Sequence, residues 1–551
     1  MQEIQRVIRI SWIVTLSLAL IFIITGSLFV KAQQLEAKQT FMVRMRDGVR
    51  LATDVYLPEG PGPFPAILIR TPYNKDALSG LGLEGKKRGY AIVIQDTRGR
   101  FASEGANLPF ETDARDGYDT LEWLTKQPWC NGKIGTFGGS ALGITQLLLA
   151  STGTHRITAQ HITVGAPSLY FDATYPGGEF RKSMIEDWLR ITKFHPDALN
   201  IWRNHPTYDA YWKGVDLENK YEKVDCPAVH IGGWFDIFAQ GTINAFLGYQ
   251  TKGGPNARGK QKLIIGPWTH AVFQDKAGEL TFPNAKNPPT NYGDAWRWFD
   301  HYLKGVDNGV DKEPAVTYYV MGDVTDPDAP GNEWRTANTW PPVKAEPTPL
   351  YLQPDKKLSW EKPTKSGKLV YTYDPKNPVP TIGGYQLTIP AGPMDQRKIE
   401  ERPDVLVFTS APLNKPLEVT GKVKVILWVS SDTPDTDFVA RLCDVYPDGR
   451  SYNICEGIIR ACFREGFTQP KWLKPGQIYR LEIDLWSTSI IFNKGHRIRL
   501  HITSSSYPGF ESNPNTAKLV YNPSDAKIAH NTIHIDAQHP SYILLPVVKK
   551  K

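Results

Sequence analysis

The stretch Ile134-Gly135-Thr136-Phe137-Gly138-Gly139-Ser140-Ala141-Leu142-Gly143 decides the fold. It has the pattern of an apolar strand that runs into glycines, then a serine, and then a helical run over 144–150. A serine on a sharp strand-to-helix turn needs small neighbours, because the tight backbone brings the flanking residues close together. Gly143 comes one place later than the last glycine of the nucleophile-elbow pattern G-x-S-x-G, so this stretch alone leaves an ordinary glycine-rich turn as an equal alternative.

Two further strand ends supply the partners that a nucleophilic serine needs. Residues 229–236 end on Asp236, and residues 263–270 end on His270. Serine, aspartate, histidine is the chain order of α/β-hydrolases, and open parallel sheets place their sites just past the carboxyl ends of the strands. Taken singly, Asp236 would be a helix N-cap and His270 a loop histidine. Taken together with Ser140, they predict a catalytic triad.

The pattern around these strand ends is typical of an α/β fold. Short apolar runs alternate with helical stretches from residue 40 to about residue 319, which indicates βαβ units around a parallel sheet. The expected strands are 66–69, 91–95, 134–137, 159–164, 228–231 and 263–265, and the expected helices include 114–125 and 295–303. We therefore expect an α/β-hydrolase domain formed by residues 40–168 and 226–340.

The stretch 169–225 interrupts this alternation with helical spacing and no strand. An insertion after a strand end commonly covers a site, so we expect a helical cap here. Its three tryptophans, Trp188, Trp202 and Trp212, could line the pocket or simply pack the cap, and packing is the favoured expectation.

Beyond residue 340 the pattern changes to strands of period two. Alternating runs cover 422–429, 438–445, 479–485 and 497–503, with turn signals such as Asp448-Gly449. Repeated strands of this kind predict a C-terminal β jelly roll over 341–551. Cys443 and Cys455 flank the Asp448-Gly449 turn and could form a disulfide across two strands, although buried free thiols are the favoured alternative.

Residues 1–32 have the character of a targeting segment. Arg6 and Arg9 precede an uncharged stretch over 10–30, and Val30-Lys31-Ala32 offers small residues at the spacing of a cleavage site. We expect an exported protein, periplasmic or extracellular. Cleavage is favoured, and an uncleaved membrane anchor is the alternative because about 21 residues can cross a bilayer.

Composition and charge exclude several classes of protein. The 551 residues are 41% hydrophobic and 22% charged, which excludes a disordered or fibrous chain. The net charge of +7 is spread along the chain apart from the terminal Lys549-Lys550-Lys551, so no nucleic-acid partner is expected.

No cofactor or metal is expected either. No C-x-x-C pair occurs, and strand alternation explains the C-terminal histidines better than metal ligation does. Residues 80–85 spell G-x-G-x-x-G outside the strand–turn–helix context of a dinucleotide site and are expected to form a loop. Residues 254–260 nearly spell a phosphate loop but are followed by Gln261 and a strand, so they are set aside too.

The chain resembles the cocaine esterase and X-Pro dipeptidyl-peptidase-like serine hydrolases, which include α-amino acid ester hydrolases. The stretches that carry the resemblance are 46–51 (RDGVRL), 70–73 (RTPY), 95–100 (QDTRGR), 103–105 (SEG), 127–132 (QPWCNG), 266–270 (GPWTH), 495–500 (GHRIRL), 504–506 (SSS) and 513–516 (NPNT). They extend over essentially all of the chain after residue 40. The family form of the elbow is G-x-S-Y-x-G, which matches the position of Gly143.

The resemblance implies a role for each site residue. Ser140 would be the nucleophile, His270 the general base and then acid, and Asp236 the group that orients the imidazole. The Tyr73 hydroxyl and the backbone N–H of Ala141 would form the oxyanion hole. Ala141 stands where the family usually has tyrosine. Because only its N–H is required, we expect catalysis to survive beside a wider pocket.

The resemblance also bears on the substrate. Phe238 and Trp268 are expected to line the substrate pocket, and Phe238 points to an apolar acyl group. Phe238 and Ala239 stand where α-amino acid ester hydrolases have acidic residues that help to bind a substrate ammonium. Substrates with a free α-amino group are therefore disfavoured, unless an acidic residue of the cap compensates. The candidates for that role are Glu179, Glu186 and Asp187.

The function expected from these features is hydrolysis of a small ester or amide by an exported serine hydrolase. One alternative within the family is X-Pro dipeptidyl-peptidase activity. A second, from another class, is a non-catalytic surface protein that binds through its jelly roll. The expected partner is a small-molecule ester or amide, and assembly as a homo-oligomer stays open.

Overall fold

The computed structural model describes residues 38–342, 344–520 and 522–549. The expected targeting segment, residues 1–32, lies outside the described residues. Among those that are described, no helix combines the length and the apolar character needed to cross a membrane.

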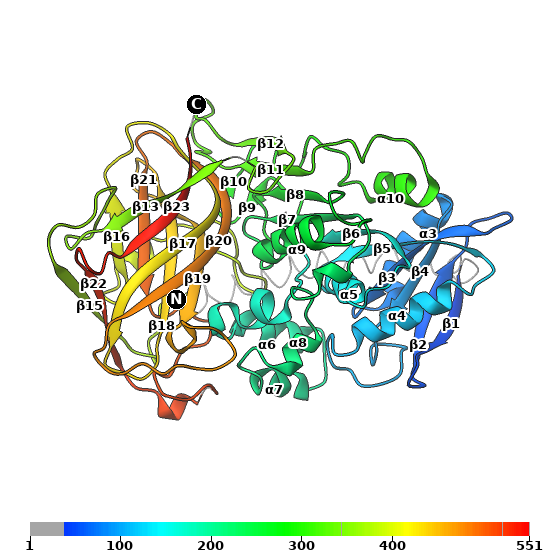
Figure 1. Ribbon diagram of the computed structural model, residues 1–551, viewed down its shortest axis with the longest axis horizontal. Helices are drawn as coiled ribbons and strands as arrows, with labels where there is room; N and C mark the ends of the chain where they lie inside the picture. The colour runs from blue at the N-terminus through cyan, green and yellow to red at the C-terminus, as the bar shows by residue number, and fades with distance from the viewer. Residues whose placement is uncertain (1–37, 343, 521, 550–551) are drawn as a thin grey trace, which may run out of the picture.

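A ten-stranded mixed sheet forms the centre of the hydrolase domain (Figure 1). Its order is β1-β2-β4-β3-β5-β6-β7-β8-β11-β12, and the pairs from β4 to β11 are all parallel. The strands are β1 Gln39–Arg44, β2 Arg50–Tyr56, β3 Phe64–Thr71, β4 Ala91–Asp96, β5 Cys130–Gly139, β6 Ile157–Thr163, β7 Ala228–Gly233, β8 Lys262–Gly266, β11 Val316–Val320 and β12 Glu333–Ala337. Every strand expected from the apolar runs is present, and the predicted α/β class is confirmed.

Helices cover both faces of this sheet, which explains why its central strands are apolar throughout. Along β3, Ala66 and Leu68 pack in one core with α4 Asp113–Leu124, α5 Ala141–Ala150 and α9 Ala239–Lys252. Ile67 and Ile69 point the other way and pack in a second core with α10 Ala295–Lys304. Because successive side chains alternate between the faces of a strand, one apolar run serves both cores.

Helix α3, Ser79–Lys87, contains the G-x-G-x-x-G stretch, so the predicted loop is wrong. Its glycines serve close packing on the sheet. A Cβ on Gly82 would lie 2.6 Å from the Tyr56 ring, and one on Gly85 would lie 2.3 Å from Ile92. Glycine has a low helix propensity, but here only glycine lets the helix approach the strands this closely.

The cap, residues 169–225, contains only helical elements among its regular structure, and all of it is described. Its elements are η2 Leu169–Thr174, η3 Pro176–Gly178, α6 Lys182–Ile191, α7 Asp197–Arg203, α8 Ala210–Gly214 and η4 Tyr221–Lys223. Trp202 and Trp212 share one core with Ile144 of α5 and with Phe238, which follows β7. The cap is therefore packed directly against the segments that follow the catalytic strands.

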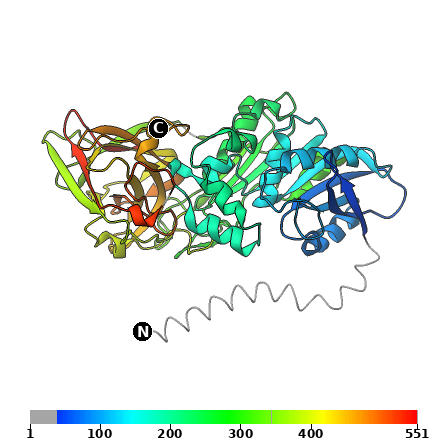
Figure 2. The ribbon, with the colours of Figure 1, turned by 90° about the horizontal axis from the view of Figure 1, so that it is seen from below.

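The C-terminal domain is all-β and contains an eleven-stranded sheet. Its strands are β13 Ala345–Leu352, β14 Lys357–Ser359, β15 Gly367–Tyr373, β16 Leu406–Ser410, β17 Leu417–Ser431, β18 Asp437–Val445, β19 Ser451–Arg460, β20 Tyr479–Phe492, β21 Arg497–Thr503, β22 Ala529–Ile535 and β23 Tyr542–Val548. The predicted alternating strands are all present. Figures 1 and 2 show this domain beside the hydrolase domain, with the cap helices next to their boundary.

The disulfide considered between Cys443 and Cys455 is absent. A bulge in the β18–β19 pair places Cys455 opposite Leu442, whereas Cys443 lies opposite Asn453. Both cysteines are buried free thiols. The hairpin predicted from the Asp448-Gly449 turn is present. The bulge shifts the register of the two strands, so Cys443 and Cys455 do not lie opposite each other.

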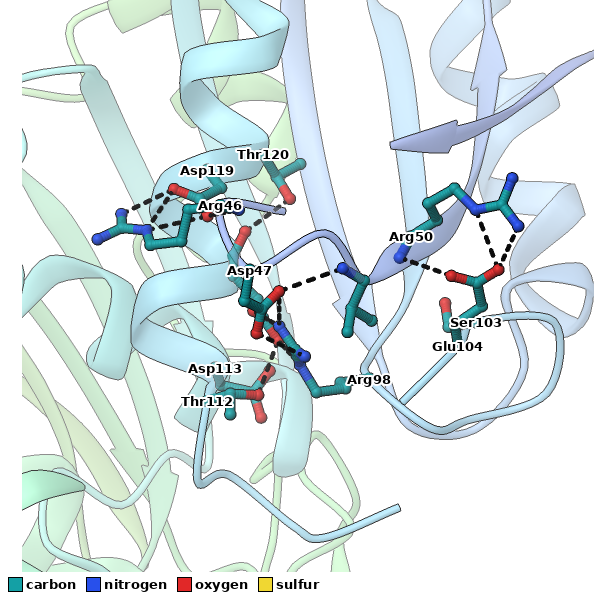
Figure 3. A network of polar contacts seen from close by, with 12 residues as sticks. Arg46, Asp47, Arg50, Arg98, Ser103, Glu104, Thr112, Asp113, Asp119 and Thr120 are labelled. Atoms are coloured by element: carbon teal, nitrogen blue, oxygen red, sulfur yellow. Dashed lines mark hydrogen bonds and ion pairs between the residues drawn. The ribbon is translucent and has the colours of Figure 1, made fainter. Parts of the chain in front are cut away.

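Three stretches that carry the family resemblance, 46–51, 95–100 and 103–105, meet in a charged network (Figure 3). Arg50 pairs with Glu104 at 2.5 Å, and Arg46 pairs with Asp119 of α4 at 2.7 Å. Arg98 lies 2.9 Å from Asp47 and also pairs with α4 through Asp116. The network joins the β1–β2 turn to α4 and to the loop that follows β4.

Candidate active site

Ser140 occupies a strained turn between β5 and α5. Its backbone has φ 58° and ψ −125°, a conformation that is rare for a residue with a side chain. Its N–H donates to the Thr163 carbonyl at 2.9 Å. A Cβ on Gly143 would lie 3.1 Å from that same carbonyl oxygen. The late glycine of the motif therefore lets α5 begin against the end of β6, and the turn has the strain of a nucleophile elbow.

His270 joins Ser140 to Asp236. Its Nε2 lies 2.9 Å from the Ser140 Oγ, and its Nδ1 lies 2.6 Å from Oδ1 of Asp236. Asp236 is fully buried, and its other oxygen accepts the Phe238 N–H at 3.2 Å. A proton on Nδ1 facing Asp236 leaves Nε2 free to accept the serine hydroxyl proton, which is the arrangement that general-base catalysis requires.

The two expected oxyanion donors lie beside Ser140. Ala141 is the first residue of α5, so its N–H has no acceptor within the helix. The Tyr73 hydroxyl hydrogen-bonds with the Ser140 side chain and accepts the Trp188 indole N–H at 3.0 Å. Although Tyr73 is 36% exposed, desolvation at its hydroxyl raises the pKa of Tyr73 above its ordinary value, with these two hydrogen bonds partly opposing the shift. Tyr73 is therefore a neutral phenol at physiological pH and can donate a proton to an oxyanion.

A narrow apolar cavity adjoins the Ser140 side chain. It is lined by Phe110, Ser140, Ala141, Ile144, Leu169, Ala173, Met184, Ile185, Trp188, Trp202, Ile237, Phe238 and Leu387. Its volume of about 20 Å³ is room for little more than one water molecule. The Phe238 ring lies edge-on to His270 with ring centroids 5.7 Å apart. None of the lining side chains is charged, so the cavity suits a small apolar group.

Trp268, expected in the pocket, lies elsewhere. It is 1% exposed and packs in the core against Phe273 and Trp334, with ring centroids 4.8 Å and 5.6 Å away. A Cβ on Gly266 would lie 2.4 Å from its ring. The Trp268 side chain thus fills space next to the strand ends and helps to fix the segment that leads to His270.

The acidic residues of the cap do not line the cavity. Glu179 is buried 3.6 Å from Arg460. Glu186 pairs with Lys182 at 3.0 Å and with Arg203, and Asp187 pairs with Arg190 at 2.7 Å. None of the three is placed to receive a substrate ammonium next to Ser140.

Two residues contribute more to the site than sequence reasoning assigned to them. Trp188 and Trp202 pack in the core of the cap, as expected, and also line the cavity, whereas Trp212 only packs. Their helical spacing carries no signal that separates these roles, because the pocket arises only when the cap folds onto α5.

Arg100, in the QDTRGR stretch, joins the cap to the catalytic loop. Its guanidinium donates to the Pro72 carbonyl at 2.9 Å and to the Lys193 carbonyl at 2.9 Å. It also lies 4.5 Å from the centre of the Phe194 ring. Pro72 precedes Tyr73, and Lys193 follows the helix that carries Trp188. Arg100 therefore fixes both sides of the Tyr73–Trp188 hydrogen bond.

In the part of the chain that the structure describes, no group of three or more His, Cys, Asp or Glu side chains could hold a metal ion.

An α/β-hydrolase fold with serine, histidine and aspartate in this geometry defines a serine hydrolase. Residues 47–194 and 191–272 match the model of the X-Pro dipeptidyl-peptidase (S15 family), and residues 308–544 match that of the X-Pro dipeptidyl-peptidase C-terminal non-catalytic domain. Cocaine esterase from Rhodococcus sp. (strain MB1 Bresler) is 33% identical, with 92% of this chain and 98% of that protein covered. The chain therefore belongs to the cocaine esterase and X-Pro dipeptidyl-peptidase-like (CocE/NonD) family, and it is a serine ester hydrolase.

Solved structures with the same architecture include two at 26% identity. An aminopeptidase from the marine sediment archaeon Thaumarchaeota archaeon has a TM-score of 0.78, with 93% of this chain and 96% of that chain covered. An α-amino acid ester hydrolase has a TM-score of 0.76 with the same two coverages. Both matches include the C-terminal β domain as well as the hydrolase domain.

Proposed function

We propose that this protein is an exported serine hydrolase that cleaves a small ester or amide with an apolar acyl group. The observation that carries the proposal is the continuous Ser140–His270–Asp236 contact, at 2.9 Å and 2.6 Å, beside a cavity without charged side chains. The contact supplies an activated nucleophile, and the uncharged lining supplies an apolar surface against which the acyl group can pack.

In the proposed mechanism, the Ser140 Oγ attacks the substrate carbonyl carbon while His270 Nε2 takes its proton. The resulting oxyanion accepts hydrogen bonds from the Tyr73 hydroxyl and the Ala141 N–H, and each such donor lowers the barrier by about 3 to 4 kcal/mol. His270 then gives the proton to the departing alcohol or amine. A water molecule, deprotonated by His270, hydrolyses the acyl-enzyme and releases the acid.

The apolar cavity supports a preference against substrates with a free α-amino group. An ammonium placed there would lose its hydration without gaining a carboxylate partner. Glu186 and Asp187 of the cap are already paired, and Phe238 forms part of the cavity wall. The same argument disfavours an X-Pro dipeptidyl-peptidase, whose substrate carries a free N-terminus, although two relatives of this chain are named for reactions on amino-acid substrates.

Export is supported by the sequence of residues 1–32 alone. Fractionation of cells that express the full chain tests it, and the N-terminal mass of the product tells cleavage from anchoring. Recovery of the protein in the cytoplasm would contradict this part of the proposal and leave the catalytic part intact.

The catalytic part is tested by labelling with a fluorophosphonate and by turnover of p-nitrophenyl butyrate. Ser140→Ala should abolish labelling and lower kcat about a million-fold. Ser151→Ala is a matched control, because Ser151 caps the same helix and bonds only the Leu148 carbonyl. Persistent labelling of Ser140→Ala would overturn the assignment.

Substrate choice separates the remaining candidates. We expect turnover of p-nitrophenyl butyrate to exceed that of glycyl-prolyl p-nitroanilide. The reverse order would replace the esterase with a dipeptidyl-peptidase. Binding of a glycan, with no turnover of an ester and amide panel, would favour the non-catalytic alternative.

A further inference from the structure

A second, larger cavity lies where the cap, α9 and the β domain meet, at the boundary between the domains in Figure 1. Its volume is about 540 Å³, which is within the range of small-molecule sites. It shares no lining residue with the cavity beside Ser140. Whatever it binds therefore lies apart from the acyl pocket.

Several charged side chains that line this cavity already have partners. Lys422 pairs with Asp484 at 2.7 Å, and Arg480 lies 3.6 Å from Glu482. Glu456 pairs with the buried Arg441 at 2.8 Å. The opposite charges within each pair compensate one another, so these side chains do not require a charged group of a ligand.

Arg181 is the cation of the cavity without a direct counter-ion. It is 2% exposed, and it takes part in no ion pair among the described residues, although the more distant charges of Glu456, Asp236 and Asp172 favour its charged form. Its Nη1 donates to the Ile237 carbonyl at 2.9 Å, while its Nε has no hydrogen-bond partner among the residues that the structure describes. Burial lowers the pKa of Arg181 to about 10, so it stays charged at neutral pH. A buried charge in this state is stabilised by a ligand carboxylate.

Two carboxyl groups in the same cavity lack a cation. Asp172 is 3% exposed and accepts the Ser168 N–H at 3.0 Å, and Glu218 accepts the Asn244 side-chain N–H at 3.0 Å. Neither takes part in an ion pair among the described residues. Burial, followed by the charge of Glu218, raises the pKa of Asp172. Burial and the neighbouring Asp216 raise the pKa of Glu218. An ammonium group would relieve both effects.

The cavity also has an aromatic wall. Trp486 and Tyr385 stack with ring centroids 4.7 Å apart, and the Arg181 guanidinium lies 5.4 Å from the centre of the Trp486 ring. Trp486 is 8% exposed and Tyr385 is 3% exposed. This wall can accept an apolar side chain next to the unpaired charges.

We propose that this cavity binds a zwitterion, namely a free amino acid or short peptide with an apolar side chain. Its carboxylate binds Arg181, its ammonium binds Asp172 and Glu218, and its side chain packs on Trp486 and Tyr385. Arg181 also holds the carbonyl of Ile237, which lies between the catalytic Asp236 and the pocket residue Phe238. An occupant thus contacts the side chain that supports the catalytic loop.

Binding is tested by calorimetry on the full chain carrying Ser140→Ala, so the result does not depend on turnover or on the proposed function. The probes are L-phenylalanine, phenethylamine, which lacks the carboxylate, and 3-phenylpropanoate, which lacks the ammonium. We expect saturable binding of one L-phenylalanine per chain, and at least tenfold weaker binding of the other two. Absence of saturable L-phenylalanine binding, or equal binding of either analogue, would overturn the proposal.

Substitutions of residues that line the cavity test where the probe binds. Glu218→Gln should weaken L-phenylalanine at least tenfold and leave 3-phenylpropanoate unchanged. Glu482→Gln is the control, because Glu482 lines the same cavity but is paired with Lys424 at 2.6 Å. Equal melting temperatures of the two variants check folding. Loss of binding after a fluorophosphonate fills the acyl pocket of the wild-type chain would assign the probe to the active site and contradict the proposal.

Discussion

The Tyr73 hydroxyl is held between the Trp188 indole and the Ser140 side chain, which are supplied by the cap and by the elbow. An oxyanion donor must keep its proton and its direction before the substrate arrives. Desolvation of the hydroxyl keeps the pKa of Tyr73 above its ordinary value, and the Trp188 N–H donates to the hydroxyl oxygen from the cap. The Tyr73 proton therefore remains available to an oxyanion that forms beside Ser140.

Replacing Tyr73 by phenylalanine removes only this donor. We expect kcat on p-nitrophenyl butyrate to fall about a hundred- to a thousandfold, with KM little changed, because the donor acts on charge that develops in the transition state. Steady-state kinetics measure both values. A kcat within threefold of wild type would exclude Tyr73 from the oxyanion hole.

Trp188→Phe keeps an aromatic wall but removes the N–H that orients Tyr73. A lost hydrogen bond of about 1 kcal/mol corresponds to a roughly fivefold to tenfold lower kcat. The effect should vanish when Tyr73 is already phenylalanine. Trp202→Phe is the control, because Trp202 also lines the cavity but donates to Tyr211. Additive effects in the Tyr73–Trp188 double-mutant cycle would contradict this positioning role.

The members of the triad could be predicted from sequence because each follows an apolar strand in the chain order of the fold. The Trp188–Tyr73 contact could not, because it joins residues 115 positions apart through a cap whose packing has no sequence pattern. Trp268 illustrates the opposite error. The family resemblance predicts Trp268 as a pocket residue, but its ring is enclosed by the core at the strand ends.

The strands could be predicted from the sequence, but helix α3 could not. Apolar runs indicate the strands, because burial on both faces of a parallel sheet requires apolar residues. The loop predicted for residues 80–85 rests on the missing strand–turn–helix context of a dinucleotide site, and that context says nothing about a helix whose glycines pack closely on Tyr56 and Ile92. Whether such a glycine-rich stretch forms a helix depends on how closely it can pack on the sheet. A single sequence does not contain that distance.

Gly143→Ala tests the close approach of α5 to β6 at the serine turn. Its Cβ would lie 3.1 Å from the Thr163 carbonyl oxygen, and Thr163 is held in β6 by pairing to both β5 and β7. Because that backbone cannot yield, we expect a loss of about 1 to 3 kcal/mol in the free energy of unfolding and a lower kcat. Gly80→Ala is the control, since a Cβ there meets open space in α3 and should add up to about 1 kcal/mol. Equal melting temperatures for the two variants would contradict the close approach of α5.

At the scale of the whole molecule, the two domains share one core. Trp234 and Ile265 of the hydrolase domain belong to the same buried cluster as Ile490 and Leu350 of the β domain. Leu387, which precedes β16 in the β domain, lines the cavity beside Ser140. Composition and turn signals could predict two domain types, but not that the second domain completes the active-site wall, because this depends on their docking.

His496 is a polar link across this boundary. Its Nε2 lies 3.1 Å from Asp323, which follows β11, and its Nδ1 lies 2.9 Å from Asp444 in β18. Burial lowers the pKa of His496, but the hydrogen bonds and charges of Asp444 and Asp323 outweigh burial and raise it above 6.5. Since the folded pKa exceeds the unfolded one, the stabilisation is fully present below the unfolded pKa and is lost as pH rises through the folded pKa.

His496→Gln should therefore destabilise the protein more at pH 6 than at pH 9. At pH 6 the variant loses a buried cation shared by two carboxylates, and we expect a loss of about 3 kcal/mol or more in the free energy of unfolding. Apparent melting temperatures of both proteins at each pH measure the difference. His530→Gln is the control, because its pair with Asp432 is exposed and should contribute under about 1 kcal/mol. A gap between wild type and His496→Gln that is the same at both pH values would show that His496 links the domains as a neutral hydrogen-bonding group, without the charge.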